Sequence, residues 1–205
     1  MDVPSPEDLA KQELRRELRA RCGSLTADAR LAASRAAVSR LLALPELEGG
    51  RTVALYAATR DEADPMGALA VLLDRGVRAV FPRVVGPQLE FAAVRDPGEL
   101  RPGHRGIGEP AGEVVDPAEV DVVVVPGLGF GEDGMRLGRG GGHYDRTLSR
   151  LPASTVRVGF CFDCQVVEHV PRRSHDQRVA VIVTDQRVIR AALVVGARRA
   201  SPSSG

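Results

Sequence analysis

The sequence contains no tryptophan and few other aromatic residues, which together make up 3% of the chain. A surface that stacks single-stranded nucleic acid needs aromatic side chains, so this class of partner is not expected. The formal net charge is only +1 and gives no electrostatic argument for binding nucleic acid or a membrane. The chain also lacks an apolar N-terminal segment and any apolar run of membrane-spanning length. We therefore expect a cytoplasmic protein without nucleic-acid or membrane partners.

Cysteine is scarce as well, and three cysteines do not suggest a disulfide framework. Cys161 and Cys164 form a single CxxC, for which a zinc site would need two more ligands. His169 and His175 are too close along the chain for the zinc-finger pattern, and Gln-Val-Val follows the motif where a redox CxxC normally opens a helix. We interpret these cysteines as small buried thiols, with metal or redox function as the less favoured alternative.

The rest of the chain has the pattern of an α/β protein. Hydrophobic residues make up 43% of it, enough for one sizeable core. Segments 52–57 and 77–81 are typical of buried strands, and a leucine-bearing helix between them starts near Asp64 and ends at Gly76. Such a unit implies a right-handed crossover and parallel pairing of its strands. Further strands are predicted at 89–94, 121–125, 156–160 and 179–184, and an ordered connecting loop at 95–119.

Two helices are predicted before the first strand. The first starts at Ser5 or Asp8 and ends at Gly23, and it carries Lys11 and Arg15 four residues apart. A solvated helix face is the simplest interpretation of these two cations. A second helix, capped by Ser24 or Thr26, carries an apolar stripe made of Leu31, Val38, Leu41 and Leu42.

The most distinctive stretch is 122–151, VVVVPGLGFGEDGMRLGRGGGHYDRTLSRL, which is typical of a strand, a long loop and a helix. Glycines let a backbone approach a ligand closely, and successive N–H groups with a following helix N-terminus attract anions. Arg136, Arg139 and Arg146 add full positive charges. We interpret the stretch as a polyphosphate cradle, and a flexible surface loop is the alternative.

The common phosphate-binding fingerprints are absent from this stretch. No GxxxxGK[ST] occurs, which excludes a P-loop NTPase of the usual kind. Residues 129–134 do spell GxGxxG, but more glycine follows instead of a helix, and no acidic residue lies at the expected distance. We therefore treat that match as accidental.

Three carboxylates are candidates for the same site. Glu62 follows the first strand at its carboxyl end, where open α/β sheets bind ligands, although a helix-start acid is an equal interpretation. Asp145 follows the triple glycine and offers hard oxygen ligands for Mg²⁺, or it serves only as an acid in the first turn of a helix. Asp176 could supply a second carboxylate from a neighbouring loop.

These motifs, taken together, resemble the signature of the 5-formyltetrahydrofolate cyclo-ligase family. The likeness rests on PGLGF at 126–130, GMRLGRGGG at 134–142 and YDR at 144–146. It extends to the Lys11-x-x-x-Arg15 pair, the strand and loop that carry Glu62, Phe81-Pro82, residues 106–110, Gln165, and His175-Asp176, all in the family's order. It covers roughly residues 9–185. One departure is His143, which stands where the family commonly has tyrosine.

The resemblance implies an enzyme that uses ATP and Mg²⁺ to convert 5-formyltetrahydrofolate to 5,10-methenyltetrahydrofolate, with release of ADP and phosphate. Asp145 and Asp176 would be the metal acids, while Ala57 and Glu62 would bind the folate. Arg139 and Tyr144 would be catalytic. The residues implied in ATP binding are Lys11, Arg15, Arg136, Gly138, Arg139, Gly140, Gly141, Gly142, His143 and Tyr144.

Pattern and resemblance together predict one compact three-layer α/β domain over residues 1–196, with a mostly parallel, Rossmann-like central sheet. Residues 197–205 are predicted to be a disordered tail. We expect a monomer whose partners are a reduced folate and ATP. Two alternatives remain open: an ATP-dependent ligase or kinase for another small substrate, and a non-catalytic relative that binds folate or nucleotide as a sensor.

Overall fold

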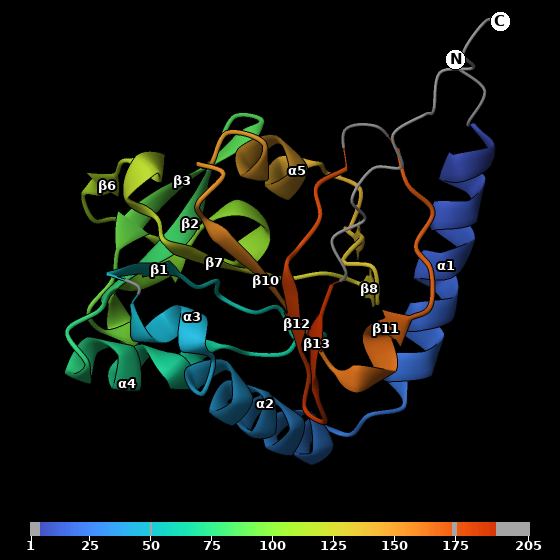
Figure 1. Ribbon diagram of the computed structural model, residues 1–205, viewed down its shortest axis with the longest axis horizontal. Coiled ribbons are helices and arrows are strands. Elements are labelled where there is room, and N and C mark those ends of the chain that lie inside the picture. The colour runs from blue at the N-terminus through green and yellow to red at the C-terminus, as the bar shows by residue number, and fades with distance from the viewer. Residues whose placement is uncertain (1–4, 50, 174–175, 192–205) are drawn as a thin grey trace, which may run out of the picture.

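A computed structural model of the chain describes residues 5–49, 51–173 and 176–191. Within them, an eight-stranded sheet forms the centre of the molecule, in the order β13-β12-β10-β7-β1-β2-β3-β6 (Figure 1). The neighbours from β12 to β2 run parallel, and β13, β3 and β6 join antiparallel at the edges. The predicted α/β fold with a mostly parallel sheet is confirmed. The strands are β1 (Thr52–Ala54), β2 (Arg78–Val85), β3 (Gln88–Ala93), β6 (Val114–Val115), β7 (Val122–Val125), β10 (Val156–Phe160), β12 (Val181–Val183) and β13 (Val188–Arg190).

The predicted strand–helix–strand unit is present between β1 and β2, which pair in parallel with Thr52 opposite Arg78. Its helix begins later than predicted. The chain first makes a 3-10 turn, η1 (Met66–Ala68), and then the short helix α4 (Leu69–Asp74). Leu69 and Leu72 of this helix are buried against the sheet, as the leucine pattern indicates.

The sheet is covered on both faces, which gives three layers (Figure 1). One face packs against α2 (Ala27–Leu42), α3 (Pro45–Glu48) and α4. The other face packs against α5 (His143–Leu148) and against a small sheet of β11 (Val166–Val167), β8 (Gly129–Gly131) and β9 (Arg136–Leu137). Alternate valines of β7 serve the two faces: Val122 and Val124 face α2, while Val123 and Val125 face α5.

The first helix, α1 (Pro6–Gly23), lies outside this arrangement and packs on the small sheet through Leu18. Ser5 caps it, and Asp8 completes a capping box, so the prediction of its start is confirmed. Thr26 caps α2. Of the apolar residues named for this helix, Val38 and Leu41 are buried, whereas Leu31 is 54% exposed. None of the helices built from the described residues is both long and apolar enough to cross a bilayer.

Two predicted loops contain regular structure. The connection 95–119 includes the short strands β4 (Leu100–Pro102) and β5 (Gly108–Pro110), besides β6, and the 3-10 turns η2 (Pro97–Glu99), η3 (His104–Gly106) and η4 (Pro117–Glu119). The glycine stretch likewise contains β8 and β9. Some of its glycines serve packing: a Cβ at Gly129 would lie 2.4 Å from Leu18 Cδ1. No helix opens after β8, which confirms that the GxGxxG match is accidental.

The cysteine prediction needs correction. Cys22 and Cys164 form a disulfide, with Cα atoms 5.9 Å apart. The bond joins the last turn of α1 to the 3-10 turn η5 (Asp163–Gln165), two elements separated by 142 residues in sequence. Their proximity follows from the packing of α1 on the small sheet, which the spacing of the cysteines does not reveal. Cys161 is a buried free thiol, as predicted.

Candidate active site

A cavity of about 500 Å³ opens at the carboxyl ends of β1 and β7. Its walls come from α1, the loop after β1, β2, the turn η3, the glycine stretch and the start of α5, together with Arg173 and Asp176. Every residue predicted for the site lines this one cavity: Lys11, Arg15, Ala57, Glu62, Arg136, Gly138, Arg139, Gly140, Gly141, Gly142, His143, Tyr144, Asp145 and Asp176. The position agrees with the rule that open α/β sheets bind ligands at this edge.

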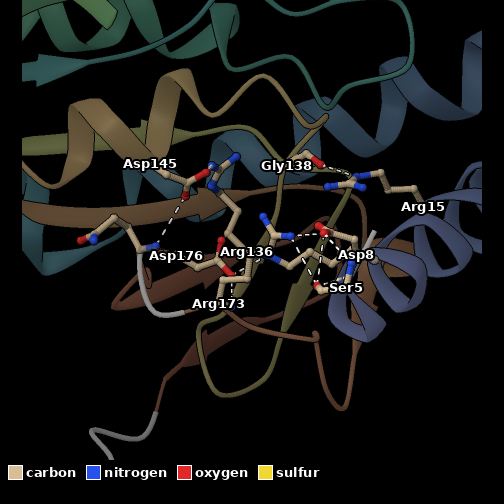
Figure 2. Close-up of polar contacts among 10 residues, drawn as sticks. Ser5, Asp8, Arg15, Arg136, Gly138, Asp145, Arg173 and Asp176 are labelled. Atoms are coloured by element: carbon tan, nitrogen blue, oxygen red, sulfur yellow. Dashed lines mark hydrogen bonds and ion pairs between the residues drawn. The ribbon is translucent and has the colours of Figure 1, made fainter. Parts of the chain in front are cut away.

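The first helix contributes the cations of one wall (Figure 2). Lys11 is not on a solvated face: it is only 7% exposed, and its Nζ lies 2.5 Å from Asp176 Oδ2. One turn further on, Arg15 donates from Nε to the carbonyl oxygen of Gly138 at 2.9 Å. The i, i+4 spacing places both cations on the same face of α1, toward the glycine stretch. A third contact at this wall is the ion pair between Arg173 and Asp8.

Arg136 lies at the floor of the cavity, where it is only 6% exposed. Its Nη2 is 2.9 Å from Asp145 Oδ2, and its guanidinium carbon lies 5.5 Å from the centre of the Tyr144 ring. A buried cation needs a compensating charge, and Asp145 supplies it. Nε of Arg136 has no hydrogen-bond partner within the described part of the chain. Arg136 therefore orients Asp145 through an ion pair and Tyr144 through contact with its ring.

The two predicted metal acids approach from different segments. Asp145 is in the first turn of α5, and its Oδ1 lies 3.5 Å from the backbone N–H of Gln177, the residue that follows Asp176. Among the described residues, no group of three or more His, Cys, Asp or Glu side chains is arranged to hold a metal by itself. Two carboxylates on the same cavity do fit Mg²⁺, which usually takes one or two from the protein and other oxygens from phosphate and water.

Glu62 also lines the cavity, and Arg139 reaches it from the glycine stretch. Nε of Arg139 is 3.0 Å from Glu62 Oε1, and Nη2 is 2.6 Å from the hydroxyl oxygen of Thr59. The second oxygen of Glu62 accepts the backbone N–H of Thr59 at 2.9 Å. The Glu62 side chain is 9% exposed, whereas that of Arg139 is 41% exposed. The carboxylate is thus fixed and shielded, and the cation is partly in solvent.

The glycine stretch narrows to a short cradle at 138–142. Gly140 and Gly142 have φ of +103° and +69°, values that other residues rarely adopt, and Gly142 is the N-cap of α5. Arg146 donates to the carbonyl oxygen of Gly141 at 2.6 Å and holds that end of the cradle. Because α5 has only six residues, the cradle's own N–H groups, rather than a long helix dipole, are its main attraction for an anion.

Two side chains at the start of α5 have shifted pKa values. Burial, followed by the charge of Glu62, raises the pKa of the Tyr144 phenol, so the phenol stays protonated and acts as a hydrogen-bond donor. Burial, then the charges of Arg146 and His104, lowers the pKa of His143. The ring centres of His143 and His104 are 6.0 Å apart.

Several cavity residues were not predicted from the sequence. Asp8 and Gln12 precede Lys11 and Arg15 by three residues each on α1, and helical spacing alone could have placed them on the same face. The turn η3 and Arg173 adjoin the motif positions 106–110 and Asp176, but nothing in their own residue types pointed to the site. The additional lining residues are Tyr56, Pro82, Val84, Leu89, His104, Arg105, Ile107, Glu109, Pro126, Gly127 and Arg173.

The fold and the cavity define an α/β protein with a cavity lined by cations and glycines at the carboxyl edge of a mostly parallel sheet, the edge where such folds bind small molecules. The family model of the 5-formyltetrahydrofolate cyclo-ligase family matches residues 7–185. The chain belongs to this family, and the resemblance found in the sequence is confirmed.

Individual relatives agree with the family. The 5-formyltetrahydrofolate cyclo-ligase of Escherichia coli (strain K12) is 32% identical over 179 residues, which are 83% of this chain and 98% of that protein. The solved structure of Aquifex aeolicus 5,10-methenyltetrahydrofolate synthetase aligns with a TM-score of 0.78 at 36% identity, over 89% of this chain and 93% of that one. The Mycoplasma pneumoniae synthetase aligns with a TM-score of 0.70 at 22% identity, over 85% and 98%, and supports the fold alone.

Proposed function

We propose that the protein converts 5-formyltetrahydrofolate to 5,10-methenyltetrahydrofolate at the expense of ATP, with release of ADP and phosphate. One observation carries the proposal: the cationic face of α1, the glycine cradle, two acids and Glu62 meet on a single cavity in a chain of this family. These residues come from segments more than 100 positions apart, and each has a chemical task in the reaction.

The triphosphate is assigned to the side of the cavity formed by α1 and the cradle. Lys11 and Arg15 would neutralise its charge, and the backbone N–H groups of 138–142 would hold its oxygens. Phosphoryl transfer requires mainly positioning and charge neutralisation, which such a site supplies. Asp145 and Asp176 would hold Mg²⁺, which when bound would neutralise phosphate charge and orient the chain of phosphates.

The folate is assigned to the side that carries Glu62. Its carboxylate would accept hydrogen bonds from the N–H donors of the pterin, beside the backbone of Ala57. Pro82, Val84 and Leu89 give the neighbouring wall an apolar surface suited to the flat rings of the substrate. Tyr144, protonated and half-buried beside Arg136, would donate a hydrogen bond at the junction of the two sides.

The chemistry explains why one cavity must hold both molecules. A formamide oxygen is a poor leaving group, and its carbon is a poor electrophile. When the formyl oxygen attacks the γ-phosphorus, the bond to the β-phosphate oxygen breaks and ADP leaves. N10 then attacks the activated formyl carbon, phosphate departs with the former formyl oxygen, and N10 loses its proton. Arg139 would stabilise the charge on the transferred group, and ring closure gains from two reacting atoms in one held molecule.

The test is turnover by the purified protein with ATP, Mg²⁺ and 5-formyltetrahydrofolate. We expect absorbance from the methenyl product and one ADP per product. Asp145→Asn should abolish turnover under conditions where circular dichroism shows the variant folded, since the change also removes the counter-charge of Arg136. Glu62→Gln should weaken folate binding more than ATP binding. Glu119→Gln is a matched control, because Glu119 pairs with Arg78 on the surface, away from the cavity. Binding of ATP without folate would instead favour a ligase or kinase for another substrate.

We propose further that the protein acts as a monomer, because the described cavity walls are complete within one chain. Use of ATP as the phosphoryl donor supports a cytoplasmic location. Sedimentation of the active enzyme and fractionation of the source cells would test these two assignments. A dimer whose dissociation abolishes turnover would contradict the first.

A further inference from the structure

Arg139 connects the two sides of the cavity. It belongs to the cradle that is assigned to the triphosphate, yet its guanidinium is bonded to Glu62, which is assigned to the folate. A second bond runs from Nη2 to the Thr59 hydroxyl. Glu62 is shielded from water, so this ion pair is stronger than an exposed one and contributes to holding Arg139 in place. One side chain therefore makes contact with both halves of the site.

The Glu62 end of this contact is rigid. Thr59 and Glu62 are bonded to each other twice, through the Thr59 N–H at 2.9 Å and between the Glu62 N–H and the Thr59 carbonyl at 3.0 Å. The Tyr56 hydroxyl donates to the Ala63 carbonyl at 2.5 Å, and Arg30 of α2 bonds to the same loop at Asp61. The loop that carries Glu62 is thus fixed at four points.

The Arg139 end is adjustable. Gly138 and Gly140 flank it, and Gly140 is at φ +103° with no atom within 4 Å of the place where a Cβ would stand. Arg15 and Arg146 hold the carbonyls of Gly138 and Gly141, so the freedom lies at Gly140 and in the Arg139 side chain itself. The side chain of Arg139 is 41% exposed, so the cavity does not enclose it. When the ion pair between Arg139 and Glu62 breaks, we expect Arg139 to move and Glu62 to keep its position.

We propose that the contact of Arg139 with Glu62 and Thr59 is a latch that makes nucleotide and folate binding mutually dependent. A triphosphate in the cradle attracts Arg139, and its departure from Oε1 leaves Glu62 open to the N–H donors of the pterin. Folate that takes over Glu62 in turn releases Arg139 to the phosphates, because coupling between two sites is reciprocal. This inference rests on the proposed function, and it adds that each of the two substrates increases the affinity for the other.

Thr59 is a positioning residue in this scheme. Within the latch, the Thr59 hydroxyl contacts Arg139 alone. The bond from Thr59 to the Glu62 carboxylate comes from its backbone N–H and not from its side chain. Thr59→Val keeps the size and β-branching of the side chain and the N–H bond to Glu62. It removes only the hydroxyl that holds Arg139 in its docked position.

The test is a titration of the wild-type protein with 5-formyltetrahydrofolate, alone and with a non-hydrolysable ATP analogue and Mg²⁺. We expect the analogue to tighten folate binding by about fivefold or more, the lower range of measured couplings. Without the analogue, Thr59→Val should bind folate about fivefold more tightly than the wild type does, the ratio expected from one lost hydrogen bond. The analogue should then increase the folate affinity of this variant by a smaller factor than in the wild type. In Arg139→Gln, the analogue should no longer change the affinity for folate. Arg16→Gln, an exposed arginine of α1 outside the cavity, should behave as wild type.

The outcomes separate the latch from the underlying function. If both ligands bind but the analogue leaves folate affinity unchanged or weakens it, the latch is wrong while the proposed function stands. Unchanged coupling in Thr59→Val, with an unaltered melting temperature, also contradicts the latch. If the wild-type protein binds neither ligand, both proposals fall.

Discussion

At the residue scale, the cavity is a set of paired charges. Two of the cations predicted to meet ATP are bonded to the two predicted metal acids: Lys11 to Asp176 and Arg136 to Asp145. The sequence could indicate that these residue types belong to the site, but the pairing depends on how distant segments meet. Each pair fixes the orientation of its carboxylate toward the cavity.

The Arg136–Asp145 pair is expected to contribute strongly to stability. Arg136→Met removes the cation and leaves the carboxylate in a mostly buried position, so the free energy of unfolding should fall by about 3 kcal/mol. Urea denaturation of the variant measures this loss. The double variant Arg136→Met with Asp145→Asn should recover part of the stability, because no unpaired charge remains. Equal losses in the single and double variants would contradict the interpretation.

His143 makes a pH-dependent contribution whose sign follows from its lowered pKa. At a pH between the pKa of His143 in the folded protein and its ordinary pKa of 6.5, the unfolded chain binds more protons than the folded protein. Stability should therefore be undiminished above about pH 6.5 and should fall as the pH drops through the folded pKa. His143→Gln should flatten this part of the stability curve. An NMR titration midpoint of His143 at or above 6.5 would contradict the prediction.

At the element scale, strong patterns predicted the structure well, and weak ones did not. The strand at 156–160 has the predicted bounds, and in its sequence VRVGF the apolar residues alternate clearly. Ser5 and Asp8 were both predicted as possible starts of α1, and the structure makes Ser5 the cap and Asp8 its partner in a capping box. The strands β4, β5, β8 and β9 have two or three residues each, too few to show alternation. They form because distant segments pair with them, which no local pattern records.

The bond between α1 and η5 gives a second prediction at this scale. Under non-reducing conditions, one thiol should react after unfolding in denaturant, and three after reduction. Reduction should lower the free energy of unfolding by about 2–4 kcal/mol, because the bond closes a long loop of the unfolded chain. Cys22→Ser should reproduce the loss and should itself be insensitive to reductant. Three reactive thiols in the unreduced, unfolded protein would contradict the bond.

At the scale of the whole molecule, the sequence predicted many of the residues that line the cavity, but not all of the segments that complete its wall. The residues expected to bind ATP, metal and folate line the cavity: Ala57, Glu62 and the glycine stretch follow strands whose carboxyl ends share one edge, while Lys11 and Arg15 reach the cavity from α1. The opposite rim, with His104 and Arg105 of η3, comes from a segment interpreted only as a connecting loop. Its position depends on the pairing of β4 with β5 and on Glu109, which accepts the N–H groups of Val84 and His104.

The complete site should require Mg²⁺. Chelation by EDTA is expected to abolish turnover and to leave the circular dichroism spectrum unchanged, because the fold rests on its own core and not on the metal. Added Mg²⁺ should restore activity. Asp145→Asn and Asp176→Asn should each raise the Mg²⁺ concentration needed for nucleotide binding by at least about tenfold. Tight nucleotide binding in EDTA would contradict the assignment of the two acids.

The docking of α1 has a consequence for synthesis on the ribosome. This helix emerges first, yet its partners at Gly138, Cys164 and Asp176 emerge last. An isolated helix of 18 residues is only marginally stable in water, so α1 must wait as a fluctuating segment while most of the chain is translated. The proposed nucleotide site is therefore not complete before residue 176 has left the exit tunnel, and a product truncated before that point is expected to be inactive.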